Sequence, residues 1–250
     1  MQINYLTSDL LTASGICHGW FMRYGGVSEG LFESLNGKKG IGDSDDNVEE
    51  NRSRAMKALG AEGNDYPKLA HILHAFKSEC LEATAAGEYD GFDAAYTSDA
   101  SLMLSQTTAD CGTVIITDKA GSIVALVHGS WHTLKEKIIC DAVAKLKLHT
   151  SDDLVAGLGP MICKNCYQFG SEAVKHFEPQ YLTPKKSKYL VDLKQIIIDQ
   201  LYESGVSQID ESSAVCTLED ERFFSHRRNG AHSGRFLTMA QLSQDLTDVI

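Results

Sequence analysis

The chain has 250 residues, of which 43% are hydrophobic and 23% charged, which is ordinary for a globular protein with a sizeable buried core. Its formal net charge of −11 argues against a nucleic-acid-binding surface, because neutralising a phosphate backbone requires clustered Lys and Arg; a small anion held by a few arginines is still compatible. No apolar run reaches the roughly 18 residues of a membrane span and the N-terminus lacks a signal-peptide layout, so we expect a cytoplasmic protein without membrane partners.

The first quarter of the chain is predicted to contain two strands and one helix. Residues 1–16 are expected to form a strand and turn, and residues 18–28 a strand that runs into a paired-glycine turn. The helix is capped by Asp45 or Asp46 and ends at Gly60. Arg52 lies on the apolar stripe of this helix, so it either extends its stem to reach water or binds an anion.

Residues 68–74 are predicted to form a strand that carries two histidines, His71 and His74. Successive side chains of a strand point to opposite faces, so residues three apart cannot ligate the same metal from one regular strand. We therefore expect only one of the two histidines to belong to a functional site.

A β-hairpin is predicted at residues 113–127, with strands at 113–117 and 123–127 and turn residues between them. If Thr117 faces Ser122 across a four-residue loop, Cys111 lies directly opposite His128; a three-residue loop would spoil this alignment. Facing Cβ atoms lie roughly 4.5–5.5 Å apart. The two side chains could share a metal ion, form a nucleophile–base pair, or be a buried cysteine beside a core histidine.

The second half of the chain is predicted to continue without a domain boundary, giving a single domain over residues 1–250. Thr133 and Glu136 fit a capping box for a helix over 133–146. The single CxxC motif at 163–166 does not by itself distinguish redox chemistry from zinc binding, and the seven scattered cysteines are expected to be mostly free thiols. Further predictions are a strand at 154–160, an exposed connection at 178–190, a helix at 190–202, a strand at 206–215, a basic segment at 222–230, and strand or helix at 236–246.

A series of short motifs in one order resembles a known family, the YfiH-like proteins once described as multicopper polyphenol oxidases or laccases. The motifs extend over nearly the whole chain: residues 18–23, 25–28, 34–36, 50–52, 73–74, 108–111, His128 with Trp131, 159–160 with 166–167, 223–225, 227–230 and 234–235. The resemblance implies an α/β (α+β) fold with a mixed, largely antiparallel β core flanked by helices, similar to that of the deamidating toxins.

The resemblance also implies a function and a site. It implies a zinc-dependent purine nucleoside phosphorylase with adenosine deaminase activity, acting on adenosine, inosine or methylthioadenosine together with phosphate. The family's metal ligands fall on His74, Cys111 and His128, and three ligands leave a fourth position open, as in catalytic zinc sites. Asp110 is then a candidate proton carrier beside Cys111 and His128. Substrate and phosphate contacts fall on Asn36, Arg52 and Arg23.

Two departures from the family pattern bear on specificity. His132 stands where an arginine is common, and Cys163, Lys164 and Asn165 replace the usual glycine, proline and cysteine. Neither change removes an implied zinc ligand. Both affect the expected substrate preference, because placed polar groups set the specificity of a pocket.

Three other functions are compatible with these residues. Cys111 and His128 could act as a metal-free cysteine hydrolase. A copper polyphenol oxidase is disfavoured because the nine histidines show no paired motifs that would supply several coppers. A binding module would bind nucleosides without turnover. The sequence leaves the metal and the oligomeric state open, with a monomer as the simplest expectation.

Overall fold

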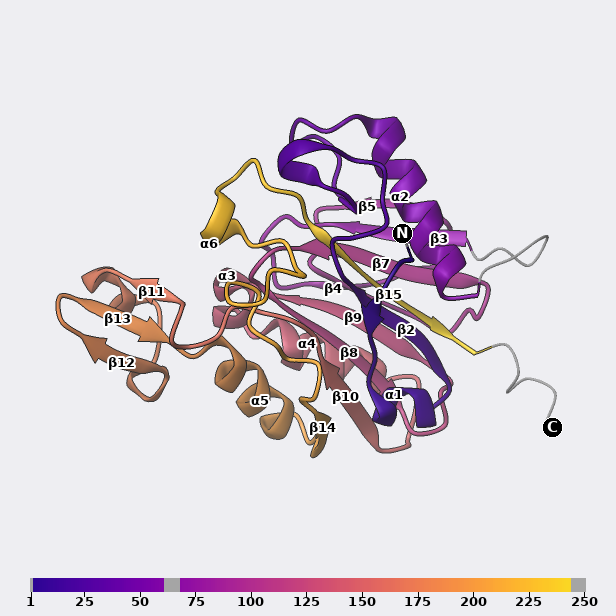
Figure 1. The fold of residues 1–250 in the computed structure, drawn as a ribbon. Coiled ribbons are helices and arrows are strands. Elements are labelled where there is room, and N and C mark those ends of the chain that lie inside the picture. Colours follow the sequence, from indigo (N-terminus) through magenta and orange to yellow (C-terminus); the bar gives the residue numbers. More distant parts are fainter. Residues whose placement is uncertain (1, 61–67, 244–250) are drawn as a thin grey trace.

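The computed structural model describes residues 2–60 and 68–243, and two six-stranded β-sheets form its centre (Figure 1). Sheet A has the order β1 (Tyr5–Leu6), β2 (Ile16–Phe21), β15 (Phe236–Leu242), β7 (Leu102–Thr108), β3 (Lys68–Leu73) and β5 (Gly87–Asp90). Sheet B has the order β14 (Gln208–Asp210), β10 (Leu154–Leu158), β8 (Gly112–Asp118), β9 (Val124–Gly129), β6 (Ala94–Thr97) and β4 (Cys80–Glu82). Most pairings are antiparallel; the parallel ones are those of β3 with β5 and β7 in sheet A, and of β10 with β14 and β4 with β6 in sheet B. The predicted mixed α+β core is confirmed.

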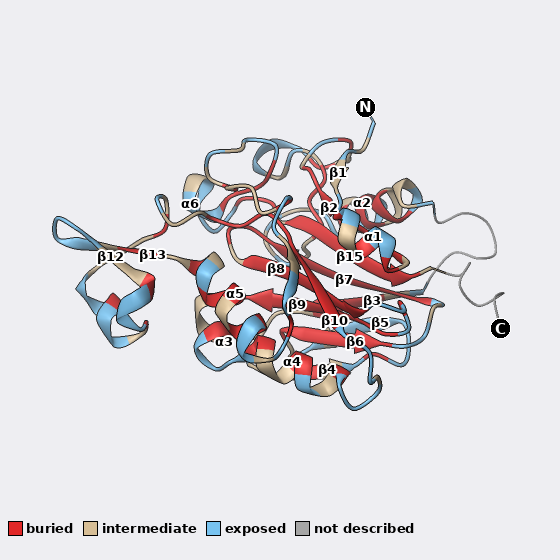
Figure 2. Cartoon of the chain, turned by 90° about the horizontal axis from the view of Figure 1, so that it is seen from below, coloured by how far each residue is buried: buried red, intermediate tan, exposed pale blue. Residues whose placement is uncertain are grey.

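The two sheets pack face to face, and helices cover their outer faces. Buried side chains from both sheets, including Trp20, Leu104, Ile115 and Leu126, form the layer between them. The helix α2 (Asp45–Ala58) packs on the outside of sheet A, and α4 (Ile138–Leu146) and α5 (Leu193–Glu203) pack on the outside of sheet B. Figure 2 shows the buried strands enclosed in this way. The remaining helices are α1 (Asp9–Ala13), α3 (Trp131–Lys135) and α6 (His226–Asn229), with 3-10 turns at Gly30–Phe32, Ser171–Lys175 and Pro179–Tyr181.

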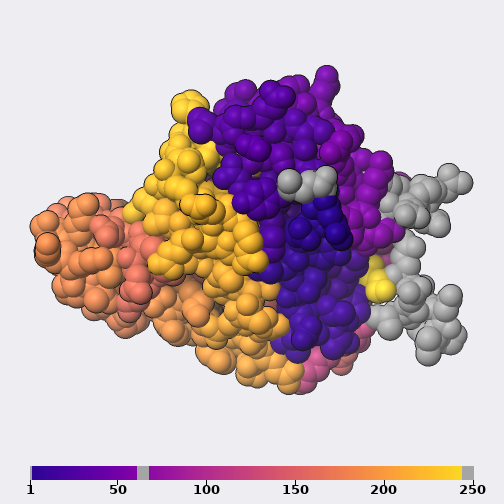
Figure 3. All heavy atoms as spheres, in the orientation of Figure 1, coloured from indigo at the N-terminus to yellow at the C-terminus, as the bar shows by residue number. Residues whose placement is uncertain are grey.

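A small third sheet projects from this body (Figures 1 and 3). It consists of β11 (Gln168–Phe169), β13 (Lys188–Val191) and β12 (Leu182–Lys185). The prediction of an exposed connection at 178–190 missed β12 and β13, because the segment is polar and contains Pro179 and Pro184. Pro184 is tolerated because β12 is an edge strand, which pairs with β13 alone and has no second neighbour that needs its amide.

The predicted helix over 133–146 is two helices. Its first turn starts earlier than predicted: Ser130 caps α3, and the side chain of Thr133 accepts the amide of Ser130 in a capping box. Lys137 then adopts a left-handed backbone with φ of 62°, which ends α3 and turns the chain into α4. The spacing of apolar residues correctly predicted α4, but it carries no information on the left-handed residue that separates α3 from α4.

Several other boundaries also shift. The predicted helix at 190–202 begins at Leu193, because residues 188–191 belong to β13. The strand predicted at 206–215 is limited to β14, and the segment after Phe236 is a strand to Leu242, with residues 244–250 outside the described part. No helix within residues 2–60 and 68–243 is long and apolar enough to cross a membrane.

Candidate functional site

A cavity of about 460 Å³ opens at one end of the two packed sheets. Sheet A contributes His74, which directly follows β3, and sheet B contributes His128 near the end of β9. Cys111 lies in the short turn that carries the chain from β7 in sheet A to β8 in sheet B. All three predicted metal-ligand residues therefore lie at one cavity. His71 points elsewhere and bonds Ser105 through Nδ1, so only one histidine of the pair faces the cavity, as predicted.

The predicted register between Cys111 and His128 is wrong. Thr117 pairs with Val124, and His128 pairs with Thr113 rather than with Cys111. The loop is wider than expected because the Asp118 carboxylate accepts both the amide of Ser122 (2.7 Å) and its hydroxyl (2.5 Å). Cys111 still lines the same cavity as His128, because the turn between β7 and β8 lies at the strand end that carries His128, and Cys111 is among the groups that raise the pKa of His128.

His128 is held by a buried carboxylate that the sequence analysis did not identify. Its Nδ1 lies 2.7 Å from Oδ1 of Asp93, which is fully buried and whose other oxygen accepts the amides of Ala75 and Lys77. Burial alone would lower the pKa of His128, but Cys111 and Asp93 outweigh it and raise that pKa to about 9. This carboxylate fixes the ring so that Nε2 is the nitrogen left for Cys111 or a metal.

His74 lies on the other side of His128, with the two rings stacked 3.6 Å apart and 7° from parallel. Burial and the neighbouring His128 lower the pKa of His74 well below its usual range, which keeps its ring neutral. Its Nε2 is 3.3 Å from Oε1 of Gln106.

The donor types at this cavity fit a zinc ion. Two imidazoles and a thiol supply nitrogen and sulfur, and the Asp93 carboxylate behind His128 is the usual outer partner of a zinc-bound histidine. The donor atoms that already lie within 4.8 Å of one another are those of His74, Asp93 and His128. Stacked parallel rings cannot both direct their in-plane lone pairs at one ion, so ligation by both histidines requires His74 to turn away from Gln106.

Three cationic side chains that the sequence analysis did not assign to the site line the same cavity: Lys38, Arg227 and Arg235. Burial and the charges of Arg235 and Arg52 lower the pKa of Lys38, and burial also lowers the pKa of Arg235. The positive charges of these side chains repel one another, and a bound anion would offset that repulsion. In a chain with a net charge of −11, they form a local concentration of positive charge, which is the chemistry that an anionic group requires.

Aromatic side chains also line the cavity, and the Arg227 guanidinium lies over the ring of one of them, Tyr167, at 5.4 Å. The aromatic rings are those of Phe76, Trp131, His132 and Tyr167. Phe76 is 57% exposed. His132 contacts Phe76 edge-to-face at 5.3 Å and Trp131 at 3.5 Å between ring centroids. Such a surface can stack against a planar heterocycle. His132, where an arginine is common in the family, is therefore part of this aromatic lining.

Asp110 and Asn36 position other residues of the cavity. Asp110 has a left-handed backbone with φ of 84°, and its two oxygens accept the hydroxyl of Thr217 and the amide of Arg227, each at 2.6 Å. Asn36 is fully buried, and its Oδ1 accepts the amides of Lys38 (3.2 Å) and Arg235 (3.0 Å). Asn36 thus holds the backbones of two cavity cations.

The structure does not bring Arg52 or Arg23 to the cavity wall. The Arg52 guanidinium is buried and donates to the carbonyl of Gly37 and to Glu88 at 2.9 Å, while its Nη2 has no hydrogen-bond partner. Arg23 donates to the carbonyl of Glu33 and lies over the Phe224 ring at 4.6 Å. The prediction for Arg52 rested on its place on the apolar stripe of the helix as well as on the resemblance, and these contacts give both arginines structural partners instead.

The fold and cavity define a class: two packed six-stranded sheets whose strand ends meet at a cysteine, two histidines and a set of cations. The chain matches the family of multi-copper polyphenol oxidoreductase laccases over residues 17–243, and it belongs to this family. Purine nucleoside phosphorylase YfiH from Shigella flexneri is 32% identical over 216 residues, which cover 83% of this chain and 86% of the relative. The protein of the same name from Escherichia coli is 31% identical with the same coverage.

Solved structures agree with this assignment. A Neisseria meningitidis protein superposes with a TM-score of 0.84 at 25% identity, covering 96% of this chain and 99% of its own. YlmD from Geobacillus stearothermophilus superposes with a TM-score of 0.82 at 26% identity, covering 92% and 93%. The resemblance to YfiH-like proteins and the fold that it implied are therefore confirmed.

Proposed function

We propose that this chain is a purine nucleoside phosphorylase that binds phosphate and a purine nucleoside in the cavity around Cys111 and His128. The observation that carries the proposal is that Lys38, Arg227 and Arg235 line that cavity together with several aromatic rings. Phosphate requires cations, and a purine base requires a flat apolar surface. The names of the relatives from Shigella flexneri and Escherichia coli support the same reaction.

In the proposed reaction, a phosphate oxygen forms a bond to the anomeric carbon of the ribose while the bond from that carbon to the purine nitrogen breaks. The electron pair of the broken bond goes to the purine, which takes up a proton. Lys38 and Arg235 hold and orient the phosphate, and Arg227 extends the positive surface. The aromatic lining positions the base. Asp110 acts as a positioning residue for Arg227 rather than as the proton carrier, because both of its oxygens already accept hydrogen bonds.

We further propose that the same cavity deaminates adenosine and that His74, Cys111 and His128 hold zinc there. Zinc supplies Lewis-acid chemistry when bound, which is what activation of a water for deamination requires. Asp93 keeps the Nε2 of His128 directed at that position, and the buried surroundings of His74 keep its ring neutral and able to ligate. Copper is the alternative metal suggested by the family's name.

A metal-free cysteine hydrolase is the second candidate, and one observation favours it. Cys111 and His128 line one cavity, and Asp93 orients the imidazole through a hydrogen bond; a thiol, an imidazole and an orienting carboxylate are the groups of a cysteine nucleophile with its base. Zinc that resists dialysis would argue against this function, because a ligated thiolate is a poor nucleophile. Rapid alkylation of Cys111 in a metal-free native protein would favour it.

The phosphate site is tested by comparing neighbouring lysines. Lys38 lines the cavity, whereas Lys39 forms an ion pair with Glu49 on the helix α2. We expect Lys38→Ala to raise the KM for phosphate about tenfold or more, since a hydrogen bond to a charged group contributes roughly 1.5–3 kcal/mol. The control Lys39→Ala is expected to leave it within about twofold of the wild-type value. Equal values for Lys38→Ala and wild type would contradict the proposed phosphate site.

A further inference from the structure

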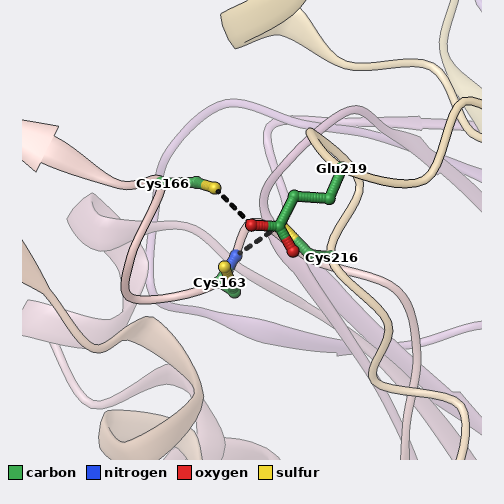
Figure 4. Close-up of side chains that lie close together, drawn as sticks. All are labelled: Cys163, Cys166, Cys216 and Glu219. Atoms are coloured by element: carbon green, nitrogen blue, oxygen red, sulfur yellow. Dashed lines mark hydrogen bonds between the residues drawn. The ribbon is translucent and has the colours of Figure 1, made fainter.

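A second cluster of potential metal ligands lies outside the cavity, where two loops run side by side. One loop follows β10 and contains Cys163 and Cys166; the other follows β14 and contains Cys216 and Glu219 (Figure 4). The loops are joined by backbone hydrogen bonds, from the amide of Met161 to the carbonyl of Val215 at 3.0 Å and from the amide of Thr217 to Met161 at 3.1 Å. Residues more than fifty positions apart are therefore held together.

The four donor atoms are close enough to surround one ion. Three sulfurs and a carboxylate oxygen all lie within 4.8 Å of one another. The Cys166 thiol donates to Oε1 of Glu219 at 3.3 Å, as Figure 4 shows. Zinc–sulfur bonds are about 2.3 Å long, so the donors of a tetrahedral site lie roughly 3.5–3.8 Å apart. Small side-chain movements would close the cluster around a metal.

The backbone of the first loop forms a tight turn that brings Cys163 and Cys166 together. The amides of Cys166 and Tyr167 both donate to the carbonyl of Cys163, at 3.0 and 3.1 Å, and the amide of Cys163 donates to the sulfur of Cys216 at 3.3 Å. Cys163 and Cys166 have the C-x2-C spacing of one arm of a zinc site, and Cys216 and Glu219 repeat that spacing in the second arm. None of these three cysteines is in a disulfide.

We propose that Cys163, Cys166, Cys216 and Glu219 form a second metal site, which takes a thiophilic divalent cation, Zn²⁺. Sulfur ligands favour zinc over the hard cations Mg²⁺ and Ca²⁺, and four protein ligands make a closed, structural site. Glu219 is the exposed member of the set, and the three cysteines are partly buried, so the ion would enter from that side. This site does not depend on the proposed enzymatic activity.

The second site would act as a clamp on one wall of the cavity. Tyr167, which lines the cavity, directly follows Cys166, and Thr217, which directly follows Cys216, donates its hydroxyl to Asp110. The amide of Ile162 also donates to the carbonyl of Asp110. A metal that joins the two loops would fix the positions of Tyr167 and Asp110 without contacting the substrate.

The test is the zinc content of the full chain, purified under reducing conditions, in four forms: wild type, Cys216→Ser, Cys111→Ser and the control Cys140→Ser. Cys140 is a partly buried free thiol outside both sites. We expect Cys216→Ser to contain one equivalent of zinc less than wild type, whereas Cys140→Ser keeps the wild-type content. The variant Cys111→Ser shows whether the cavity also holds zinc. If the cavity holds none, wild type contains one equivalent of zinc per chain; Cys111→Ser keeps that zinc and Cys216→Ser loses it.

A second measurement covers the case in which Cys216→Ser does not fold. Wild type and Cys111→Ser are loaded with Co²⁺, and the thiolate-to-cobalt charge-transfer absorption is recorded. The proposal predicts that most of this absorption persists in Cys111→Ser, because three of four thiolates belong to the second site. Loss of the absorption in Cys111→Ser, equal zinc in wild type and Cys216→Ser, or a disulfide among Cys163, Cys166 and Cys216 in the metal-free protein would each overturn it.

Discussion

Replacing Asp93 with asparagine removes the group that orients His128 while nearly preserving its shape. The fully buried carboxylate accepts from Nδ1 of His128 at 2.7 Å and from the amides of Ala75 and Lys77 at 3.0 and 2.9 Å. An asparagine has one acceptor oxygen, so it can serve either the imidazole or the two amides. A lost second-sphere partner of a metal ligand typically costs about 10–100-fold in metal affinity or activity, or about 1.4–2.7 kcal/mol.

We therefore expect Asp93→Asn to weaken zinc binding and to lower the kcat/KM of adenosine deamination by about 10–100-fold each. Zinc affinity is measured by competition with a coloured chelator, and deamination by the formation of inosine from adenosine. Asp90→Asn is a matched control, because Asp90 is exposed on the edge strand β5. A folded Asp93→Asn protein with both quantities within twofold of wild type would refute the role assigned to Asp93.

Three further predictions concern residues around the cavity. Asn36→Ala is expected to raise the KM for phosphate severalfold with a smaller change in kcat, because the amides of Lys38 and Arg235 lose their acceptor; an unchanged KM would contradict this role. Arg52→Ala is expected to lower the free energy of unfolding by about 1–3 kcal/mol in urea titrations and to leave the KM for phosphate unchanged, because its bonds are to Gly37 and Glu88. Burial would raise the pKa of Asp43, but hydrogen bonds from Ser28, Asn36, Asn47 and the Ser44 amide lower it below its usual value. The ionised carboxylate therefore stabilises the fold above the unfolded-state pKa near 4, and this stabilisation is lost as the pH falls through the folded-state pKa. We expect the free energy of unfolding of Asp43→Asn to fall less steeply than that of wild type between about pH 5 and 2.

The sequence was sufficient for the elements whose signals are local. The β-branched runs at 113–117 and 123–127 form adjacent strands, and the apolar spacing around Val48 and Met56 forms α2, because each pattern matches the period of its element. The register between β8 and β9 could not be predicted, since it depends on how the Asp118 side chain organises the loop.

The site residues also fall into those that the sequence could identify and those that depend on tertiary structure. His74, Cys111 and His128 could be named because they lie in motifs that resemble a family, and the structure brings them to one cavity. Asp93 could not be named, because its role depends on the pairing of β6 with β9, which places its carboxylate beside His128. An acidic residue directly before a buried strand was the only local signal.

The cations of the cavity show a further limit of sequence analysis. Lys38 and Arg235 are about two hundred positions apart, and they meet because Asn36 accepts both backbone amides. Arg52 attracted attention because it is a charge on an apolar stripe, yet that position is explained by its bond to Glu88. A buried arginine in a sequence indicates that a partner exists, and it does not indicate whether that partner is a ligand or another side chain.

The products formed from inosine, with and without inorganic phosphate, test the proposed phosphorylase activity most directly. We expect hypoxanthine and ribose 1-phosphate in equal amounts, formed only when phosphate is present, and strongly reduced in Lys38→Ala but not in Lys39→Ala. Release of hypoxanthine at the same rate without phosphate, or no release by a folded, zinc-loaded protein, would contradict it.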